Sequence, residues 1–318
     1  MLKIGDIVGT EAQGGGLISR LIKFGNQEPG EGLTRVSHDA MVYAIATYEE
    51  SGDKQYWLKY HSPDKSKEPS IVGAQPLSLG LKSGKIYGAL HPMYYSDEIK
   101  TSIIPQEQIH EQAIRLTPEN AWIASKLVES TSPKVINTRT VGYYLAKGKC
   151  YIYRIKGLDE NALERIVSFA LDRVGQRYGF RHIGLYAVSA ALGRLFSYPV
   201  YWIARLLHAK VNFRSPRIYR NDPKAPMVCS QLVAAAYASL PSRICYPVLD
   251  EGRVWENPYF PGITRPYFKR EYADYPKIEF GGPWGCIAPD DIDDWCLAES
   301  QLLDGRAEEI FAGGLKDV

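Results

Sequence analysis

The stretch at residues 226–240 reads Pro226-Met227-Val228-Cys229-Ser230-Gln231-Leu232-Val233-Ala234-Ala235-Ala236-Tyr237-Ala238-Ser239-Leu240. Small and apolar residues dominate it, which predicts a buried helix over residues 227–240. The run Asp222-Pro223-Lys224-Ala225-Pro226 directly before it cannot be helical, so it limits where the helix begins. Cys229 therefore falls in the predicted first turn.

A cysteine in that position has two interpretations. The N–H groups at a helix N-terminus stabilise a nearby anion, so they lower the pKa of a thiol there and raise its thiolate fraction at neutral pH. The same groups can bind the negative charge that develops on an attacked carbonyl oxygen. The alternative is a small apolar side chain packed beneath the helix. The position of Cys229 alone leaves both interpretations open.

A catalytic cysteine requires a base, and a buried strand offers one. Residues 36–47 are rich in β-formers and nearly continuously apolar after Asp39, which predicts a strand buried on both faces. His38 lies at its start and is the best strand-borne candidate for the base. A histidine in an apolar strand is otherwise a core residue whose hydrogen bonds are satisfied.

A second strand is predicted over residues 55–61, paired with the first across a turn at residues 49–54. His61 ends this strand. If the two strands are hairpin neighbours, His61 comes beside His38 and orients its imidazole, which is the third role in a catalytic triad. Its alternative is an ordinary histidine at the end of a strand.

Four short motifs follow one another along the chain. They are Gly5-Asp6-Ile7-Val8, Ser37-His38-Asp39-Ala40-Met41-Val42, Gly175-Gln176-Arg177-Tyr178-Gly179-Phe180 and Val228-Cys229-Ser230-Gln231-Leu232-Val233. In this order they resemble the circularly permuted, papain-like branch of the NlpC-type cysteine peptidases and amidases, the YiiX/YaeF-like group. In that branch the histidine precedes the cysteine, as His38 precedes Cys229 here. The late run Ala288-Pro289-Asp290-Asp291-Ile292 is similar to a segment that often closes the domain.

The resemblance implies an α+β fold, in which a small antiparallel sheet packs on the cysteine-bearing helix. It implies Cys229 as nucleophile, His38 as general base, and a polar residue on the strand after the histidine as the group that orients the base. That residue is commonly glutamate in the family, but Lys59-Tyr60-His61-Ser62-Pro63 occupies the region here, so His61 takes the role. Tyr178 and Ser230 are expected to contact the substrate.

Three further elements are predicted from local patterns. Residues 149–155 alternate as a strand, and residues 159–174 carry the apolar stripe of a helix that Gly175 ends. Thr117-Pro118-Glu119-Asn120 has the form of an N-cap followed by proline, which predicts a helix through Val128. A short helix is also expected over residues 17–24.

Length and composition limit the class of protein. The chain of 318 residues is expected to form one elaborated domain, with insertions at about 62–148, 183–222 and 241–285. Hydrophobic residues make up 45% and charged residues 23%, enough apolar material for a buried core. Lys and Arg number 38 against 36 Asp and Glu, which gives no support to a nucleic-acid partner. The five cysteines form no CxxC pair and no disulfide framework, so we expect neither a metal nor a cofactor.

One apolar stretch, residues 183–209, raises the question of a membrane. Arg194, Pro199 and Arg205 interrupt it, so we do not expect a span. It suits either an interfacial helix pair on a membrane surface or an insertion buried against the protein or a partner. The N-terminal residues show no apolar run of a secretory signal, which predicts a cytoplasmic protein; a virion-associated protein, or one exported without such a signal, is the alternative.

Three functions fit these observations. The first is a thiol amidase or endopeptidase that cleaves a peptide, peptidoglycan or acyl-amide substrate through a Cys229 thioester. The second is a lipid-directed thiol acyl-transfer enzyme or esterase, which the 183–209 stretch motivates. The third is a non-catalytic component of a larger assembly, for example in a phage, for which the insertions leave room.

Overall fold

The computed structural model describes most of the segments that carry these motifs. It covers residues 2–11, 35–50, 56–63, 70–73, 77–80, 86–88, 113–180, 211–212, 224–240, 249–256, 263–268, 292–293, 296–297, 300–301, 303 and 305–318. The helix expected over residues 17–24, the whole 183–209 stretch and residues 288–291 lie outside this set.

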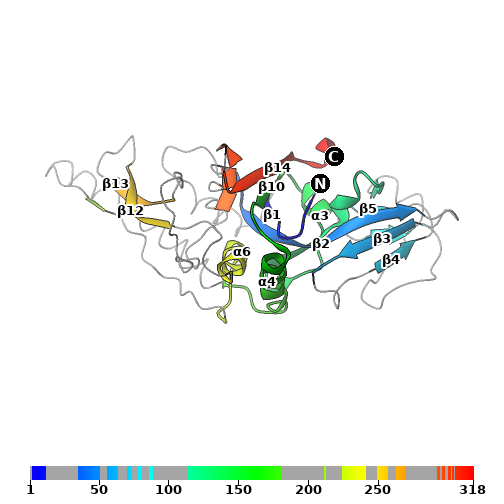
Figure 1. The fold of residues 1–318 in the computed structure, drawn as a ribbon, viewed down its shortest axis with the longest axis horizontal. Helices are drawn as coiled ribbons and strands as arrows, with labels where there is room; N and C mark the ends of the chain where they lie inside the picture. The colour runs from blue at the N-terminus through cyan, green and yellow to red at the C-terminus, as the bar shows by residue number, and fades with distance from the viewer. Residues whose placement is uncertain are drawn as a thin grey trace.

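An open antiparallel sheet of eight strands forms the centre of the described structure (Figure 1). Six of its strands follow one path, and two more, β8 and β9, branch from β2. Along the path the strands are β14 (Ala307–Gly313), β10 (Cys150–Ile155), β1 (Ile7–Thr10), β2 (His38–Glu50), β3 (Tyr56–His61) and β4 (Ser70–Gly73), and the branch comprises β8 (Lys126–Ser130) and β9 (Val135–Ile136). Every pairing in this sheet is antiparallel.

The length of β2 determines what lies beside the candidate base. Its first residues pair with β1, where His38 stands opposite Thr10, and its middle pairs with β8, where Met41 stands opposite Val128. Only the far half, from Ile45 onward, pairs with β3. A strand of 13 residues therefore has different neighbours at its two ends.

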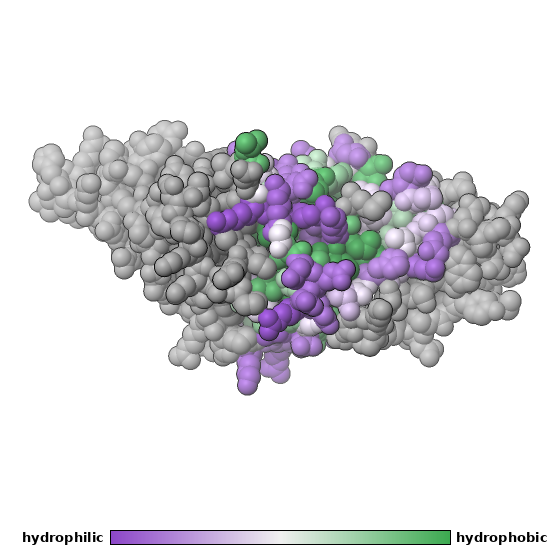
Figure 2. Space-filling view, viewed as in Figure 1, coloured by the Kyte–Doolittle hydropathy of each residue, from purple (hydrophilic) through white to green (hydrophobic). Residues whose placement is uncertain are grey.

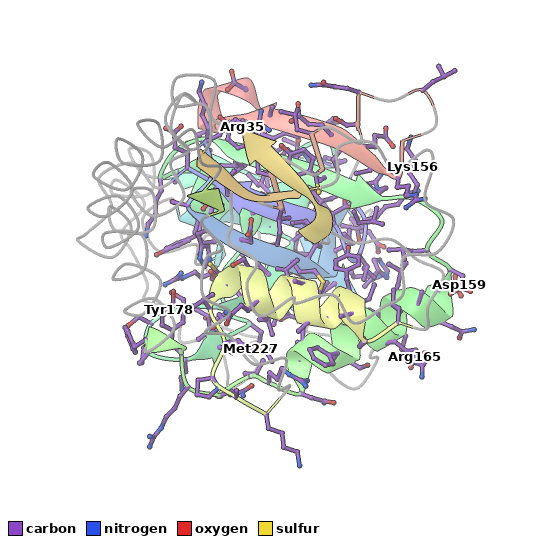
Figure 3. All side chains as sticks on the ribbon, turned by 90° about the vertical axis from the view of Figure 1, so that its left-hand side faces the viewer. Arg35, Lys156, Asp159, Arg165, Tyr178 and Met227 are labelled. Atoms are coloured by element: carbon purple, nitrogen blue, oxygen red, sulfur yellow. The ribbon has the colours of Figure 1, made fainter. Side chains whose placement is uncertain are left out.

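Two helices cover one face of the sheet (Figures 1 and 3). Helix α6 (Cys229–Ala238) packs on β2 and β8, and α4 (Glu160–Leu171) packs beside it. Residues 229–237 of α6 are all buried, which explains why this helix is apolar on every side. Its alanines let the helix approach the strands closely. The 3-10 helix η2 (Ala121–Ala124) and the short helix α3 (Val141–Leu145) pack against one another, and η2 also contacts β2.

The remaining described elements lie outside the central sheet. One small sheet has the order β11 (Val211–Asn212), β13 (Ile263–Phe268), β12 (Leu249–Glu256), and another has the order β6 (Ile86–Gly88), β5 (Leu77–Gly80), β7 (Ala113–Arg115). The 3-10 helix η4 (Leu315–Asp317) follows β14. In Figure 1, β12 and β13 lie at one end of the elongated molecule and β3 to β5 at the other.

The Gly5-Asp6 motif enters the sheet as a tight turn. Gly5 has a φ of +84°, and a Cβ there would lie 2.8 Å from Cδ2 of Leu163 on α4, so only glycine fits. The Asp6 carboxylate is buried and accepts two hydrogen bonds from Arg154, at 3.0 and 2.8 Å. The motif therefore serves the packing of β1.

The elements agree in part with the sequence-based predictions. The structure has the mixed α/β architecture with an open antiparallel sheet that an α+β prediction requires. The helix over residues 227–240, the helix over 159–174 and the strand over 149–155 are confirmed, with ends that differ by a few residues.

The helix predicted from residue 117 through Val128 is wrong. Only the four residues of η2 are helical, and the chain then enters β8. The Asn120 side chain bonds back to the Thr117 backbone N–H at 2.8 Å, so it stabilises the turn before η2 instead of capping a long helix. As a result, β8 belongs to the central sheet, although it falls within the expected 62–148 insertion.

The surface of the described part is mixed in polarity. Figure 2 shows hydrophilic side chains over much of this face, with hydrophobic side chains visible between them. Among the described residues, no helix combines the length and apolarity that a membrane crossing needs.

Candidate active site

The N-terminus of α6 positions Cys229 against the sheet. Cys229 is the first residue of the helix and is 1% exposed. The Gln231 side chain accepts a hydrogen bond from the Val228 backbone N–H at 3.1 Å, which closes the first turn. The Ser130 hydroxyl on β8 donates to the Met227 carbonyl oxygen at 2.6 Å, so the strand anchors the residues that lead into the helix. The thiol is therefore held at a fixed place beside β2 and β8.

His38 lies between this thiol and a carboxylate. The Nε2 atom of His38 is 2.5 Å from Oε2 of Glu129, and the imidazole also forms a hydrogen bond with the Cys229 thiol. Because Nε2 is engaged by Glu129, the other ring nitrogen, Nδ1, is the one that faces the sulfur. The structure thus brings Cys229, His38 and Glu129 together in one hydrogen-bonded chain.

The charges of the first two groups depend on each other. Burial alone raises the pKa of the Cys229 thiol, but the charge and hydrogen bond of His38 outweigh it and lower that pKa. Burial alone lowers the pKa of His38, but Cys229 and Glu129 together outweigh it and raise that pKa. At neutral pH both effects favour a thiolate beside an imidazolium.

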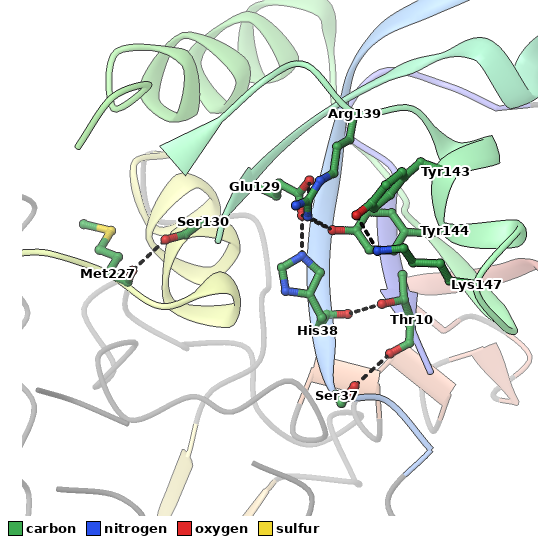
Figure 4. Close-up of polar contacts among 10 residues, drawn as sticks. All are labelled: Thr10, Ser37, His38, Glu129, Ser130, Arg139, Tyr143, Tyr144, Lys147 and Met227. Atoms are coloured by element: carbon green, nitrogen blue, oxygen red, sulfur yellow. Dashed lines mark hydrogen bonds and ion pairs between the residues drawn. The ribbon is translucent and has the colours of Figure 1, made fainter. Parts of the chain in front are cut away.

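Glu129 is fully buried and has three partners, drawn in Figure 4. Besides His38, it accepts a short hydrogen bond from the Tyr144 hydroxyl, and its Oε1 atom lies 3.3 Å from a guanidinium nitrogen of Arg139. Burial raises the pKa of this carboxyl, but the hydrogen bond and charge of His38, followed by the charge of Arg139, lower it overall. A buried carboxylate with these donors stays ionised.

His61 does not reach the site, so its predicted role as the orienting residue is wrong. It stands opposite Ile45, seven residues along β2 from His38, and its imidazole contacts the Thr47 hydroxyl at 3.1 Å. The prediction assumed that the strand following β2 in sequence is its neighbour at His38. At His38 the paired strand is β1, and β8 pairs with β2 from Met41 onward and supplies Glu129 to the imidazole instead.

The residues around Glu129 have the pattern of a strand, but the N-cap pattern at residues 117–120 favours a helix over the same residues. One acid, Glu129, follows apolar residues in the run Lys126-Leu127-Val128-Glu129-Ser130, as expected of a functional residue on a strand. The apparent cap at residues 117–120 led to a helical prediction through Val128. Only the long-range pairing of β8 with β2 shows where the carboxylate points.

The two predicted substrate-binding residues both lie next to Cys229. Tyr178 follows α4 and pairs with Met227, directly before the helix (Figure 3). Burial raises the pKa of the Tyr178 hydroxyl, and the negative charge of nearby Cys229 raises it further. The Ser230 backbone N–H forms a hydrogen bond with the Cys229 sulfur, while the Ser230 side chain is fully buried. Tyr178 thus lies beside the Cys229 thiol, and Ser230 contacts the sulfur through its backbone N–H.

No family model, curated protein or solved structure matches the chain. Within the described residues there is also no cluster of three His, Cys, Asp or Glu side chains that could hold a metal ion.

Proposed function

We propose that this protein is a cysteine hydrolase that cleaves an amide or peptide bond through a thioester on Cys229. One observation carries the proposal: a buried chain runs from the Cys229 thiol through His38 to Glu129, at the start of a helix. Cys229, His38 and Glu129 are thus connected in the order nucleophile, base and orienting group that acyl transfer requires.

The roles follow from the chemistry of each group. The Cys229 thiolate attacks the carbonyl carbon, and the N-terminal N–H groups of α6 stabilise the resulting oxyanion. The C–N bond breaks as the His38 imidazolium protonates the leaving amine. Neutral His38 then takes a proton from water, whose oxygen attacks the thioester and releases the acid and the thiolate. Throughout, Glu129 holds the His38 ring by Nε2 and stabilises its positive charge.

The fold supports the same proposal. The strand that carries the base precedes the helix that carries the nucleophile, and the two elements pack against each other. This is the order of the circularly permuted papain-like group that the sequence motifs resemble. A glutamate orienting the histidine is also common in that group. By this resemblance we infer a peptide-like substrate, with a peptidoglycan stem peptide as the first to test.

A thiol-directed probe tests the nucleophile. An iodoacetamide probe at neutral pH should label the wild-type protein at Cys229 and lose that label in Cys229→Ala. The matched control is Cys150→Ala, because Cys150 is also buried but burial raises the pKa of its thiol to about 12, so its removal should leave labelling unchanged. Equal labelling of wild type and Cys229→Ala would exclude Cys229 as the reactive thiol.

A second experiment tests the reaction. Incubation with a panel of peptides and purified peptidoglycan fragments should release new amino groups with the wild-type protein and none with Cys229→Ala. Release that persists in Cys229→Ala would contradict the proposed mechanism.

A further inference from the structure

The carboxylate end of the site contains two residues that the proposed mechanism does not use. Arg139 lies between β9 and α3, and its carbonyl oxygen accepts a hydrogen bond from the Leu127 backbone N–H on β8 at 3.0 Å. Tyr144 lies on α3, which begins after the N-cap Thr140. Both side chains therefore come from one short segment that is fixed against the strand carrying Glu129 (Figure 4).

Their contacts form a closed set around Glu129. A guanidinium nitrogen of Arg139 donates to the Tyr144 hydroxyl at 2.9 Å and lies 3.3 Å from Oε1 of Glu129. The Tyr144 hydroxyl in turn donates to Oε2 of Glu129, the oxygen that faces His38. The Tyr144 ring also lies beside the His38 ring, with 5.4 Å between the centroids. Hydrogen bonds from His38, Tyr144 and Arg139 thus converge on Oε2 of Glu129, the Arg139 bond at 3.4 Å, while Oε1 lies within ion-pair distance of the same guanidinium.

Charge balance gives this arrangement a consequence. The thiolate of Cys229 and the carboxylate of Glu129 are two buried negative charges, and His38 and Arg139 supply two positive ones. Without Arg139 the set carries a net negative charge in a site of low polarity, so protonation of the thiolate or the carboxylate becomes favourable. Arg139 contacts Glu129, and through this carboxylate it affects the protonation of both the Cys229 thiol and the His38 imidazole.

We propose that Arg139 and Tyr144 are positioning residues that hold the Glu129 carboxylate charged and aimed at His38, and that thereby maintain the Cys229 thiolate. This inference rests on the proposed function, because it concerns the same thiol. The groups that bear on the titration are few. Cys229 faces His38 from β2 and Tyr178 from the segment after α4, and Glu129 faces His38, Arg139 and Tyr144.

The experiment measures the thiolate directly. The ultraviolet absorbance of the thiolate is followed against pH for each protein, and the spectrum of the same protein carrying Cys229→Ala is subtracted. This readout needs neither substrate nor reagent access to the buried sulfur, and a merely structural role for Arg139 would not move it. Circular dichroism and urea unfolding confirm that each variant is folded.

The expected result is a graded shift of the titration midpoint. Arg139→Gln should raise the midpoint by about one pH unit, since a nearby opposite charge lowers or raises a pKa by that order. Tyr144→Phe should raise it by less, and Arg139→Lys should retain part of the wild-type value because it keeps the charge. Arg165→Gln is the matched control: it removes the same charge from the exposed side of α4 and should leave the midpoint unchanged.

Two outcomes separate this inference from the proposed function. A low wild-type midpoint that is unchanged in both Arg139→Gln and Tyr144→Phe overturns the positioning role and leaves the catalytic proposal standing. A wild-type midpoint in the ordinary range of a free thiol overturns the ion pair itself. If Arg139→Gln does not fold, Tyr144→Phe and Arg139→Lys decide the question by the same measurement.

Discussion

At the level of single residues, burial raises the pKa of two thiols, but a neighbouring charge reverses the shift in one of them. Cys150 and Cys229 are both buried, but the pKa of Cys150 rises to about 12 because its surroundings are apolar. The pKa of Cys229 is lowered because His38 supplies a positive charge and a hydrogen bond that outweigh the cost of burial. The contact with His38, and not exposure, distinguishes the surroundings of Cys229 from those of Cys150.

The pH dependence of catalysis follows from these two shifts. Activity should rise with pH as the Cys229 thiol loses its proton, below the ordinary range of a thiol, and fall as His38 loses its proton, above the ordinary range of an imidazole. Glu129→Gln removes the charge that favours the imidazolium, so the pKa of His38 should fall and that of Cys229 should rise. The pH range of full activity should therefore become narrower at both its acid and its alkaline end. We expect kcat at the optimum to fall about tenfold or more. Peptide hydrolysis measured against pH checks both statements.

His61→Ala serves as the comparison for Glu129→Gln. Its imidazole contacts the Thr47 hydroxyl at the far half of β2, seven residues along the strand from His38, so the pH profile and kcat should match wild type. A loss of activity in His61→Ala equal to that in Glu129→Gln would contradict the assignment of the orienting role.

The element that organises the site is β8. It lies beside the middle of β2, supplies Glu129 from one residue and anchors the approach to α6 through the next, Ser130. Helix α6 packs on both strands, so Cys229 and His38 are positioned by one pair of neighbouring strands. The separation of the Cys229 thiol and the His38 imidazole therefore depends on the hydrogen bond between Ser130 and Met227, in which neither Cys229 nor His38 takes part.

Ser130→Ala tests this contact. The Met227 carbonyl would lose the Ser130 hydroxyl but keep the Gly179 backbone N–H at 3.0 Å, so the free energy of unfolding should fall by about 0.5–1.5 kcal/mol. The substitution should also reduce kcat, because the first turn of α6 is less firmly held. Ser239→Ala is the control: its hydroxyl donates to the Ala236 carbonyl at the other end of α6, so stability should fall without loss of kcat per folded molecule. Urea unfolding and hydrolysis rates measure the two effects, and an unchanged kcat in Ser130→Ala would show that the anchor does not serve catalysis.

In the molecule as a whole, residues from both halves of the chain meet around Asp293. Asp293 is buried and accepts hydrogen bonds from Arg35 at 2.9 and 3.0 Å and from the Tyr153 hydroxyl at 2.6 Å. Arg35 lies three residues before His38, and its guanidinium also lies 3.3 Å from Glu309 on β14. This cluster joins the start of β2 to β10, β14 and the C-terminal region. It thereby fixes the end of the strand that carries the base.

Asp293→Ala should destabilise the fold more than a change at Glu309. Removing the buried carboxylate takes from the Tyr153 hydroxyl its acceptor and leaves Arg35 with the longer contact to Glu309, and we expect a loss of about 2–3 kcal/mol, reduced from a fully buried pair because Arg35 is 30% exposed. Glu309→Gln, at a longer and more exposed contact, should cost about 0.5 kcal/mol or less. Urea denaturation compares the two. Equal losses would mean that Asp293 does not join the sheet as described.

Features that depend on neighbouring residues could be predicted from the amino-acid sequence. Prolines and small apolar residues located α6 and put Cys229 in its first turn, and an apolar β pattern located His38 at the start of a strand. These are short-range signals, because helix periodicity, capping and strand composition act within a few residues. The pairing of the Cys229 thiol with the His38 imidazole could therefore be predicted from the sequence.

The groups that surround the Cys229 thiol and the His38 imidazole could be identified only from the folded chain. Glu129 lies 91 residues from His38 and meets it because a long β2 has β8 beside its first half and β3 beside its second. Strand pairing between distant segments leaves no local pattern, so the sequence favoured the wrong partner, His61. The lowered pKa of Cys229 was likewise settled by the fold, since burial and opposing charges act through space and not along the chain.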